Sequence, residues 1–166
     1  MTVQTQALLR AAGLQDADAI SRVIADALRQ TNAADYGADV IARMTTSYNA
    51  PRVGLMIRGR EMFVAELEDE IVGVIGYSGG TVRSLFIAPA HQGIGVGRQL
   101  LASVESRARH AAIRSLTVAA SLTAIGFYRR CGFATLRPVD STGIAMMLMH
   151  KWLVDIDEPT LFWKAG

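Results

Sequence analysis

The chain has 166 residues, of which 51% are hydrophobic and 19% charged, and its net charge is +2. This length and composition predict one domain with a sizeable core and exclude a disordered chain. The single cysteine, Cys131, excludes an internal disulfide, and the six-residue apolar run 144–149 is too short for a membrane span, which takes ~20 residues. The first residues lack the features of a secretory signal, so we expect a cytoplasmic protein without a membrane partner.

The first 60 residues predict one strand, two helices and a loop. An apolar run predicts a strand over 7–11, and apolar residues at helical spacing over 20–28 predict a helix that Asp16 or Asp18 can cap. A shorter helix is expected over 38–44. The segment 45–60 is expected to be a loop because it contains turn-forming residues: Asn49, Pro51, Gly54 and Gly59.

The middle of the chain predicts an antiparallel meander. Three runs rich in β-branched residues are separated only by Asp69-Glu70 and Gly79-Gly80, and such short connections join antiparallel neighbours. The expected strands cover 62–67, 71–77 and 81–87.

The pattern changes after Pro89, where a glycine-rich turn leads into a helix with an apolar stripe that includes Leu100, Leu101 and Val104. A strand over 115–119 follows, and a strand–helix–strand unit implies a parallel crossover. The last expected elements are a helix over 122–130, ended by Gly132, and strands over 133–137 and 144–153.

These elements together predict an α/β (α+β) fold. We expect a mixed, mostly antiparallel sheet of about seven strands, flanked by about four helices, with a parallel strand pair in its middle. The expected organisation is a single domain over 1–154 and a C-terminal tail over 155–166.

Residues 92–98 form a glycine-rich turn (Gln-Gly-Ile-Gly-Val-Gly-Arg) where a strand ends and a helix begins. A helix N-terminus carries free N–H groups and a positive dipole end, and glycines let a phosphate approach the backbone closely, so we expect a phosphate or pyrophosphate site. A P-loop is excluded because no lysine precedes Lys151. The glycine spacing, and the lack of an acid on the next strand, do not fit a dinucleotide fingerprint.

The stretch 83–130 contains seven arginines and one acid, Glu105. Such a basic block attracts nucleic acid, a membrane surface or a small polyanion. Because the basic elements show no recognisable pattern of interleaved aromatic residues, a nucleic-acid partner is not expected, and an anionic ligand of the turn accounts for the charge.

Gln92, Gly95 and Gly97 match the pattern Gln/Arg-x-x-Gly-x-Gly/Ala, and in this the chain resembles the GNAT superfamily of acyl-CoA-dependent N-acetyltransferases. Two further segments are similar to that family: the strand that leads to Pro89, and residues 124–133, which read A-x-x-F-Y-x-x-x-G-F. The resemblance implies transfer of an acetyl group from acetyl-CoA to a primary amine, of a small molecule or a peptide, by direct attack in a ternary complex.

The resemblance also implies roles for single residues. Tyr128 matches the tyrosine that gives a proton to the departing thiolate, and Ser121 stands where many members have an asparagine beside the pantetheine. The backbone of Phe86 and Ile87 is expected to pair with the pantetheine arm, which enters where the two parallel strands splay, and Leu85 beside them is a further cofactor-binding candidate. The remaining cofactor-binding candidates form the turn: Gln92, Gly93, Ile94, Gly95, Val96, Gly97 and Arg98.

The general base stays unassigned. Many members carry a glutamate on the strand before the turn, where this chain has Val82, Arg83 and Ser84. Glu66 and His150 are candidates, beside a water chain or direct attack by an amine of low pKa, and Arg83 favours an anionic acceptor.

The missing glutamate keeps a second function open, a non-catalytic acyl-CoA sensor of the same fold. No metal site is expected, since no His or Cys cluster has ligand spacing. The acceptor pocket is expected between the first two helices, the segment 45–60 and the late strands. The apolar residues 161–163 of the tail are expected to dock on this domain or on a second subunit, which leaves a homodimer open.

Overall fold

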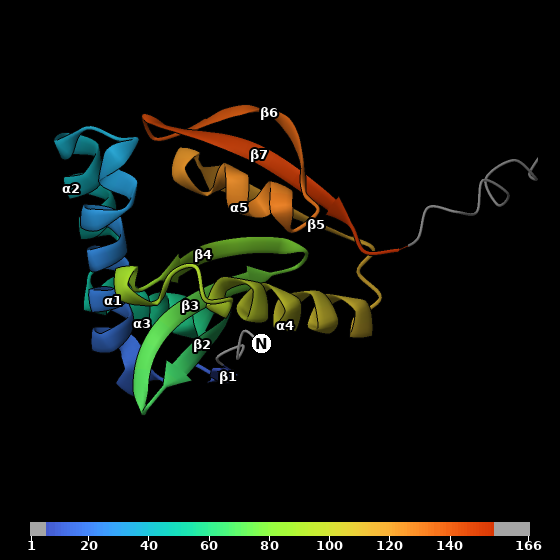
Figure 1. Cartoon of the computed structure of the whole chain (residues 1–166), viewed down its shortest axis with the longest axis horizontal. Helices are drawn as coiled ribbons and strands as arrows, with labels where there is room; N and C mark the ends of the chain where they lie inside the picture. The colour runs from blue at the N-terminus through green and yellow to red at the C-terminus, as the bar shows by residue number, and fades with distance from the viewer. Residues whose placement is uncertain (1–5, 155–166) are drawn as a thin grey trace, which may run out of the picture.

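The computed structural model describes residues 6–154, which form one seven-stranded sheet and five α-helices (Figure 1). The strand order is β1-β2-β3-β4-β5-β7-β6, and every neighbouring pair is antiparallel except the parallel pair β4 and β5. The strands are β1 (Leu8–Ala11), β2 (Glu61–Leu67), β3 (Glu70–Ser78), β4 (Thr81–Ile87), β5 (Ser115–Ser121), β6 (Ala134–Ser141) and β7 (Ile144–Trp152). The expected fold class is confirmed, and the predicted tail lies outside the described residues.

Helices cover the sheet on both faces. The helices are α1 (Ala17–Gln30), α2 (Ala38–Ser47), α3 (Ala50–Gly59), α4 (Val96–His110) and α5 (Ile125–Arg130), and 3₁₀ turns lie at Leu14–Asp16, Asn32–Ala34, Pro89–His91 and Leu122–Ala124. The first three helices form one apolar core with β2 and β3, around Ile24 and Val74, while α4 and α5 form the second core, around Leu100 and Met149. No helix within residues 6–154 is long and apolar enough to cross a membrane.

The segment 45–60 is helical, so the prediction of a loop was wrong. Helix α2 continues to Ser47, and α3 begins after Asn49, whose side chain accepts a hydrogen bond from the Arg52 N–H at 3.0 Å. Pro51 lies in the first turn of α3, where a proline is tolerated, and Val53 is fully buried. Asn and Pro mark turns and helix starts alike, and the sequence analysis chose the turn.

Strand β4 pairs with β5 over only two residue pairs, Thr81 with Thr117 and Val82 with Val118. Directly afterwards Ser84 has a φ of +54°, and the register between β3 and β4 shifts. A bulge of this kind bends a strand, and beyond it β4 runs apart from β5. Figure 1 shows β5, β6, β7 and α5 on one side of the molecule and β2, β3, β4 and α4 on the other.

The segment between α1 and α2 joins these two halves through polar contacts. The Tyr36 hydroxyl donates to the Ala145 carbonyl of β7 at 2.7 Å and accepts from the Leu122 N–H at 2.9 Å. The Arg43 guanidinium on α2 donates to the Thr142 carbonyl at 3.0 Å. These contacts therefore attach α1, α2 and the segment between them to the half of the sheet that contains β5, β6 and β7.

A substitution inside α3 tests the corrected boundary. A Cβ at Gly54 would meet no atom within 4 Å, and alanine is favoured over glycine in a helix interior by roughly 1 kcal/mol. We expect Gly54→Ala to raise the free energy of unfolding by about 0.5–1 kcal/mol in urea denaturation. Unchanged or lower stability would contradict a helix at this position.

Candidate active site

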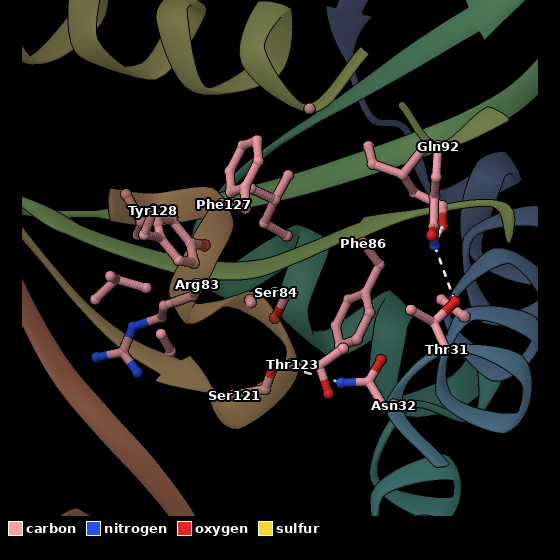
Figure 2. Close-up of a pocket in the computed structure, with 18 of the residues that line it drawn as sticks. Thr31, Asn32, Arg83, Ser84, Phe86, Gln92, Ser121, Thr123, Phe127 and Tyr128 are labelled. Atoms are coloured by element: carbon pink, nitrogen blue, oxygen red, sulfur yellow. Dashed lines mark hydrogen bonds between the residues drawn. The ribbon is translucent and has the colours of Figure 1, made fainter. Parts of the chain in front are cut away.

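A cavity of about 540 Å³ lies where β4 and β5 diverge. This size is typical of a small-molecule site. Its wall is formed by β4, the glycine turn, β5 and α5, with α1 and α2 contributing from the other face of the sheet. Figure 2 shows Gln92 and Thr31 on one side of it and Tyr128 and Arg83 on the other, with Ser84 between them.

The glycine turn places the N-terminus of the 15-residue helix α4 at this cavity. Gly95 is the N-cap and has a φ of +95°, a conformation that favours glycine. Gly93, Gly97 and Arg98 line the cavity as well, whereas Ile94 is 39% exposed and the Val96 side chain is buried in the core. The turn therefore presents backbone N–H groups and one guanidinium, which together suit an anion.

Gln92 holds the turn in place. Its side-chain amide donates to the Ile87 carbonyl at 3.1 Å and to the Thr31 hydroxyl at 3.0 Å (Figure 2). The glutamine thus ties the turn to the end of β4 and to the end of α1, and it acts as a positioning residue.

The end of β4 offers free backbone to a ligand. The Ala88 N–H donates to the Val72 carbonyl of β3 at 2.8 Å, and the polar groups of successive strand residues point in opposite directions. The backbone N–H and carbonyl of Ile87 therefore face the gap between β4 and β5, and no described residue of β5 pairs with them. The backbone of Phe86 faces β3 instead. Phe86 and Leu85 line the cavity too, and Figure 2 shows the Phe86 ring there.

Tyr128 on α5 lies in the wall with 3% of its surface exposed. Its ring packs edge-on against Phe127 and Phe133, at centroid distances of 5.3 and 5.2 Å. Burial raises the pKa of the Tyr128 phenol above its ordinary value, so the hydroxyl stays protonated at neutral pH. No described residue hydrogen-bonds this hydroxyl, and it is available as a proton donor.

Three further polar side chains of the wall lie near the ends of β4 and β5. Ser121 lines the cavity and accepts a hydrogen bond from the Asn32 amide at 3.4 Å. His91 Nδ1 and Thr123 Oγ1 are buried and have no hydrogen-bond partner among the described residues. Buried polar atoms are rarely left unpaired, so these two indicate a ligand with polar groups of its own.

The sequence analysis missed Tyr48, Met44, Thr31 and Asn32, all of which line the cavity. The Tyr48 hydroxyl lies 3.3 Å from Ser84 Oγ, and its ring packs edge-on against Phe86 at 5.4 Å. No motif marks these residues, because the fold alone brings them to β4. The only signal was the expectation that the first helices and the segment 45–60 form the acceptor pocket.

Neither candidate base lines the cavity. Glu66 accepts a hydrogen bond from Arg10 at 2.6 Å, and that arginine also pairs with Asp16. His150 packs edge-on against Trp152 on β7 at a centroid distance of 4.7 Å. Within residues 6–154, no aspartate or glutamate lines the cavity, and no group of His, Cys, Asp and Glu is arranged to hold a metal ion.

Gly97 tests the packing of the turn. A Cβ there would lie 3.2 Å from the Phe127 ring, and because this ring lines the cavity, its displacement changes the cavity wall. The gain in helix propensity offsets the crowding, so we expect Gly97→Ala to change stability by less than about 1 kcal/mol while the affinity for CoA falls about tenfold. Calorimetric titration measures the affinity, and Gly54→Ala is the matched control, with unchanged CoA affinity. Equal CoA affinity in both variants would contradict the assignment of the turn.

The comparisons with known proteins agree with this fold. A family model described as an acetyltransferase (GNAT) domain matches residues 32–153. The structure is similar to a GCN5-related N-acetyltransferase of Rhodopseudomonas palustris, with 23% identity, 92% of this chain and 99% of that chain covered, and a TM-score of 0.85. It is also similar to the PaiA N-acetyltransferase of Thermoplasma acidophilum in complex with coenzyme A (17% identity, 89% and 99% covered, TM-score 0.73). A third is YncA of Salmonella typhimurium with its cofactor acetyl-CoA (21% identity, 95% and 99% covered, TM-score 0.61).

A search of the curated proteins gave no match. The likeness to the solved structures shows a shared fold. The family model spans well over half of the chain, and on this ground the protein belongs to the GNAT acetyltransferase family.

Proposed function

We propose that this protein is an acetyl-CoA-dependent N-acetyltransferase that acts on a primary amine, of a small molecule or a peptide, in a ternary complex. One observation carries the proposal: a single cavity connects the glycine turn before α4 with the buried Tyr128. The two similar structures that contain coenzyme A or acetyl-CoA support the choice of cosubstrate.

The residues of the cavity fit coenzyme A. The N–H groups before α4 and the Arg98 guanidinium suit a pyrophosphate, and the Ile87 N–H faces the gap as an open strand edge does. His91 Nδ1 and Thr123 Oγ1 need polar partners that a bound pantetheine or phosphate can supply. When bound, acetyl-CoA supplies the acetyl group as a thioester.

Tyr128 then donates its proton to the CoA thiolate, which leaves when the amine attacks the thioester carbonyl. Because burial keeps its pKa high, the phenol is protonated throughout the physiological range, as a general acid requires. Its position opposite the Gln92 side of the cavity (Figure 2) is consistent with a ligand that extends from the turn to the reacting centre.

The acceptor amine attacks only in its neutral form. No described carboxylate lines the cavity, while Arg83, Arg98 and Arg130 do, and nearby positive charge disfavours an ammonium ion. We propose that the amine loses its proton to water as it enters, without a carboxylate base from residues 6–154.

The same absence of a carboxylate from the described wall favours the second candidate, a non-catalytic acyl-CoA sensor. The two functions differ in turnover. Release of free thiol from acetyl-CoA, measured against a panel of primary amines, is amine-dependent for an enzyme and absent for a sensor.

Ligand-dependent stability tests the cosubstrate. A ligand at 100 times its dissociation constant adds ~2.7 kcal/mol to the free energy of unfolding, which for a domain of this size raises Tm by about 5–10 °C. We expect this shift with CoA and acetyl-CoA and none with NAD, the control. An equal shift with NAD, or none with either CoA species, would contradict the proposed cosubstrate.

Two matched tyrosine variants test the proton donor. Tyr128→Phe removes the hydroxyl from the cavity wall, and we expect kcat to fall about 100-fold with little change in the KM of acetyl-CoA. Tyr77→Phe is the control, because Tyr77 is equally buried, has an unpartnered hydroxyl among the described residues and lies outside the cavity wall.

The pH profile gives a second readout for the same residue. Since the pKa of Tyr128 is raised, wild-type kcat should show no loss from this group on the alkaline side below about pH 10. Wild-type turnover by Tyr128→Phe would show that another group supplies the proton.

A further inference from the structure

The charges of the cavity wall are all of one sign among the described residues. Three arginines line it, Arg83, Arg98 and Arg130, and no described aspartate or glutamate does. None of the three forms an ion pair or a side-chain hydrogen bond with another described residue. A cavity of this kind attracts anions wherever its arginines are accessible.

The phosphates of the cosubstrate account for only part of this charge. Arg98 lies in the first turn of α4, directly after the glycine turn, where a pyrophosphate fits. Arg83 lies across the cavity, on the side of Tyr128 and away from Gln92 (Figure 2). It therefore sits at the reacting end, where a second ligand has to meet the acetyl group.

Arg83 also points to the face opposite α4. Val82 belongs to the core under α4, and neighbouring side chains of a strand alternate between faces, so Arg83 points to the face that carries α1, α2 and α3. The residue is exposed and lines the cavity, and it therefore lies at a mouth of the cavity on this face.

A second arginine, Arg60, lies near Arg83. Arg60 follows α3, and its side chain passes over Gly76, where a Cβ would lie 3.3 Å from Arg60 Cδ and 3.0 Å from the Arg83 carbonyl oxygen. Burial, and then the charge of Arg83, lower the pKa of the Arg60 guanidinium. Arg60 has no carboxylate partner among the described residues, so the two guanidinium groups repel each other with no acid between them.

We propose that Arg83, with Arg60 behind it, binds an anionic group of the acceptor, so that the acceptor is an amine that also carries a carboxylate or a phosphate. This inference rests on the proposed function. Arginine donates several hydrogen bonds to either anion, and Tyr48 beside Ser84 adds an aromatic wall for the body of the molecule. A polyamine or a lysine-rich peptide lacks the anion and meets only like charge at this mouth.

The test uses pairs of acceptors in which one member carries an anion and the other has an uncharged group in its place. Phenylalanine is compared with phenylalaninamide, and O-phosphoethanolamine with ethanolamine, by thiol release from acetyl-CoA. The amine of the amide is less basic, so a larger fraction of it is neutral and able to attack near neutral pH. A preference for the acid therefore reports recognition of the carboxylate. The pair with the larger preference identifies which anion the mouth takes.

Variants of the full chain then locate the anion site. We expect Arg83→Gln to lower the preference for the anionic acceptor about tenfold, Arg83→Lys to keep part of it, and Arg60→Gln to lower it less. The KM of acetyl-CoA should stay unchanged, and Arg83→Gln should lower kcat/KM for the anionic acceptor more than for its uncharged counterpart. Arg58→Gln is the matched control, because Arg58 is exposed and outside the cavity wall. Preference for the uncharged acceptors, or an equal loss on both kinds in Arg83→Gln, overturns the proposal.

Binding separates this proposal from the proposed function. Calorimetric titration measures N-acetylphenylalanine, its amide, and O-phosphoethanolamine against the CoA complex of wild type and Arg83→Gln. Tighter binding of the anions that depends on Arg83, with no amine acetylated, supports the anion site and rejects acetyl transfer. Acetylation without any Arg83-dependent binding of anions rejects the site and keeps acetyl transfer.

Discussion

The separation of β4 from β5 after two residue pairs is the constraint on which the rest of the structure depends. A continuous parallel pair would satisfy the inner edges of both strands and leave no room between them. The bulge at Ser84 instead turns β4 away, and the Ile87 backbone is left facing a gap. Gln92 donates a hydrogen bond to the Ile87 carbonyl, and the Ile87 N–H is left for a ligand. The bulge in β4 thus leaves a strand edge that can bind a ligand.

A sheet divided in this way needs other contacts to hold its halves. The segment between α1 and α2 provides them, since Tyr36 bonds to both Ala145 and Leu122, and Asn32 reaches Ser121. The same segment supplies Thr31, which holds Gln92. One stretch of chain therefore joins the two halves of the sheet and, through Thr31 and Asn32, lines the cavity.

Local patterns predicted the strands, the glycine turn and the helix that carries Tyr128, because each is fixed by neighbours in the sequence. The helix α3 was missed because Asn49 and Pro51 begin a helix as readily as they form a turn. Tyr48 reaches Ser84 only through the packing of α2 and α3 on the sheet, which no local pattern encodes. Glu66 appeared as a free carboxylate in the sequence, but its partner Arg10 is 56 residues away and became visible only in the fold.

The contacts of Tyr36 and the two β4–β5 residue pairs join the two halves of the sheet at two places. Two such connections restrain the halves of the sheet from moving apart, so a long ligand has to enter along the gap between them. Under the proposed function, the depth of the gap, and not the spread of the two halves, would limit which acyl groups reach Tyr128. The strand pairing would in this sense contribute to the choice of acyl chain before any side chain touches the acyl group.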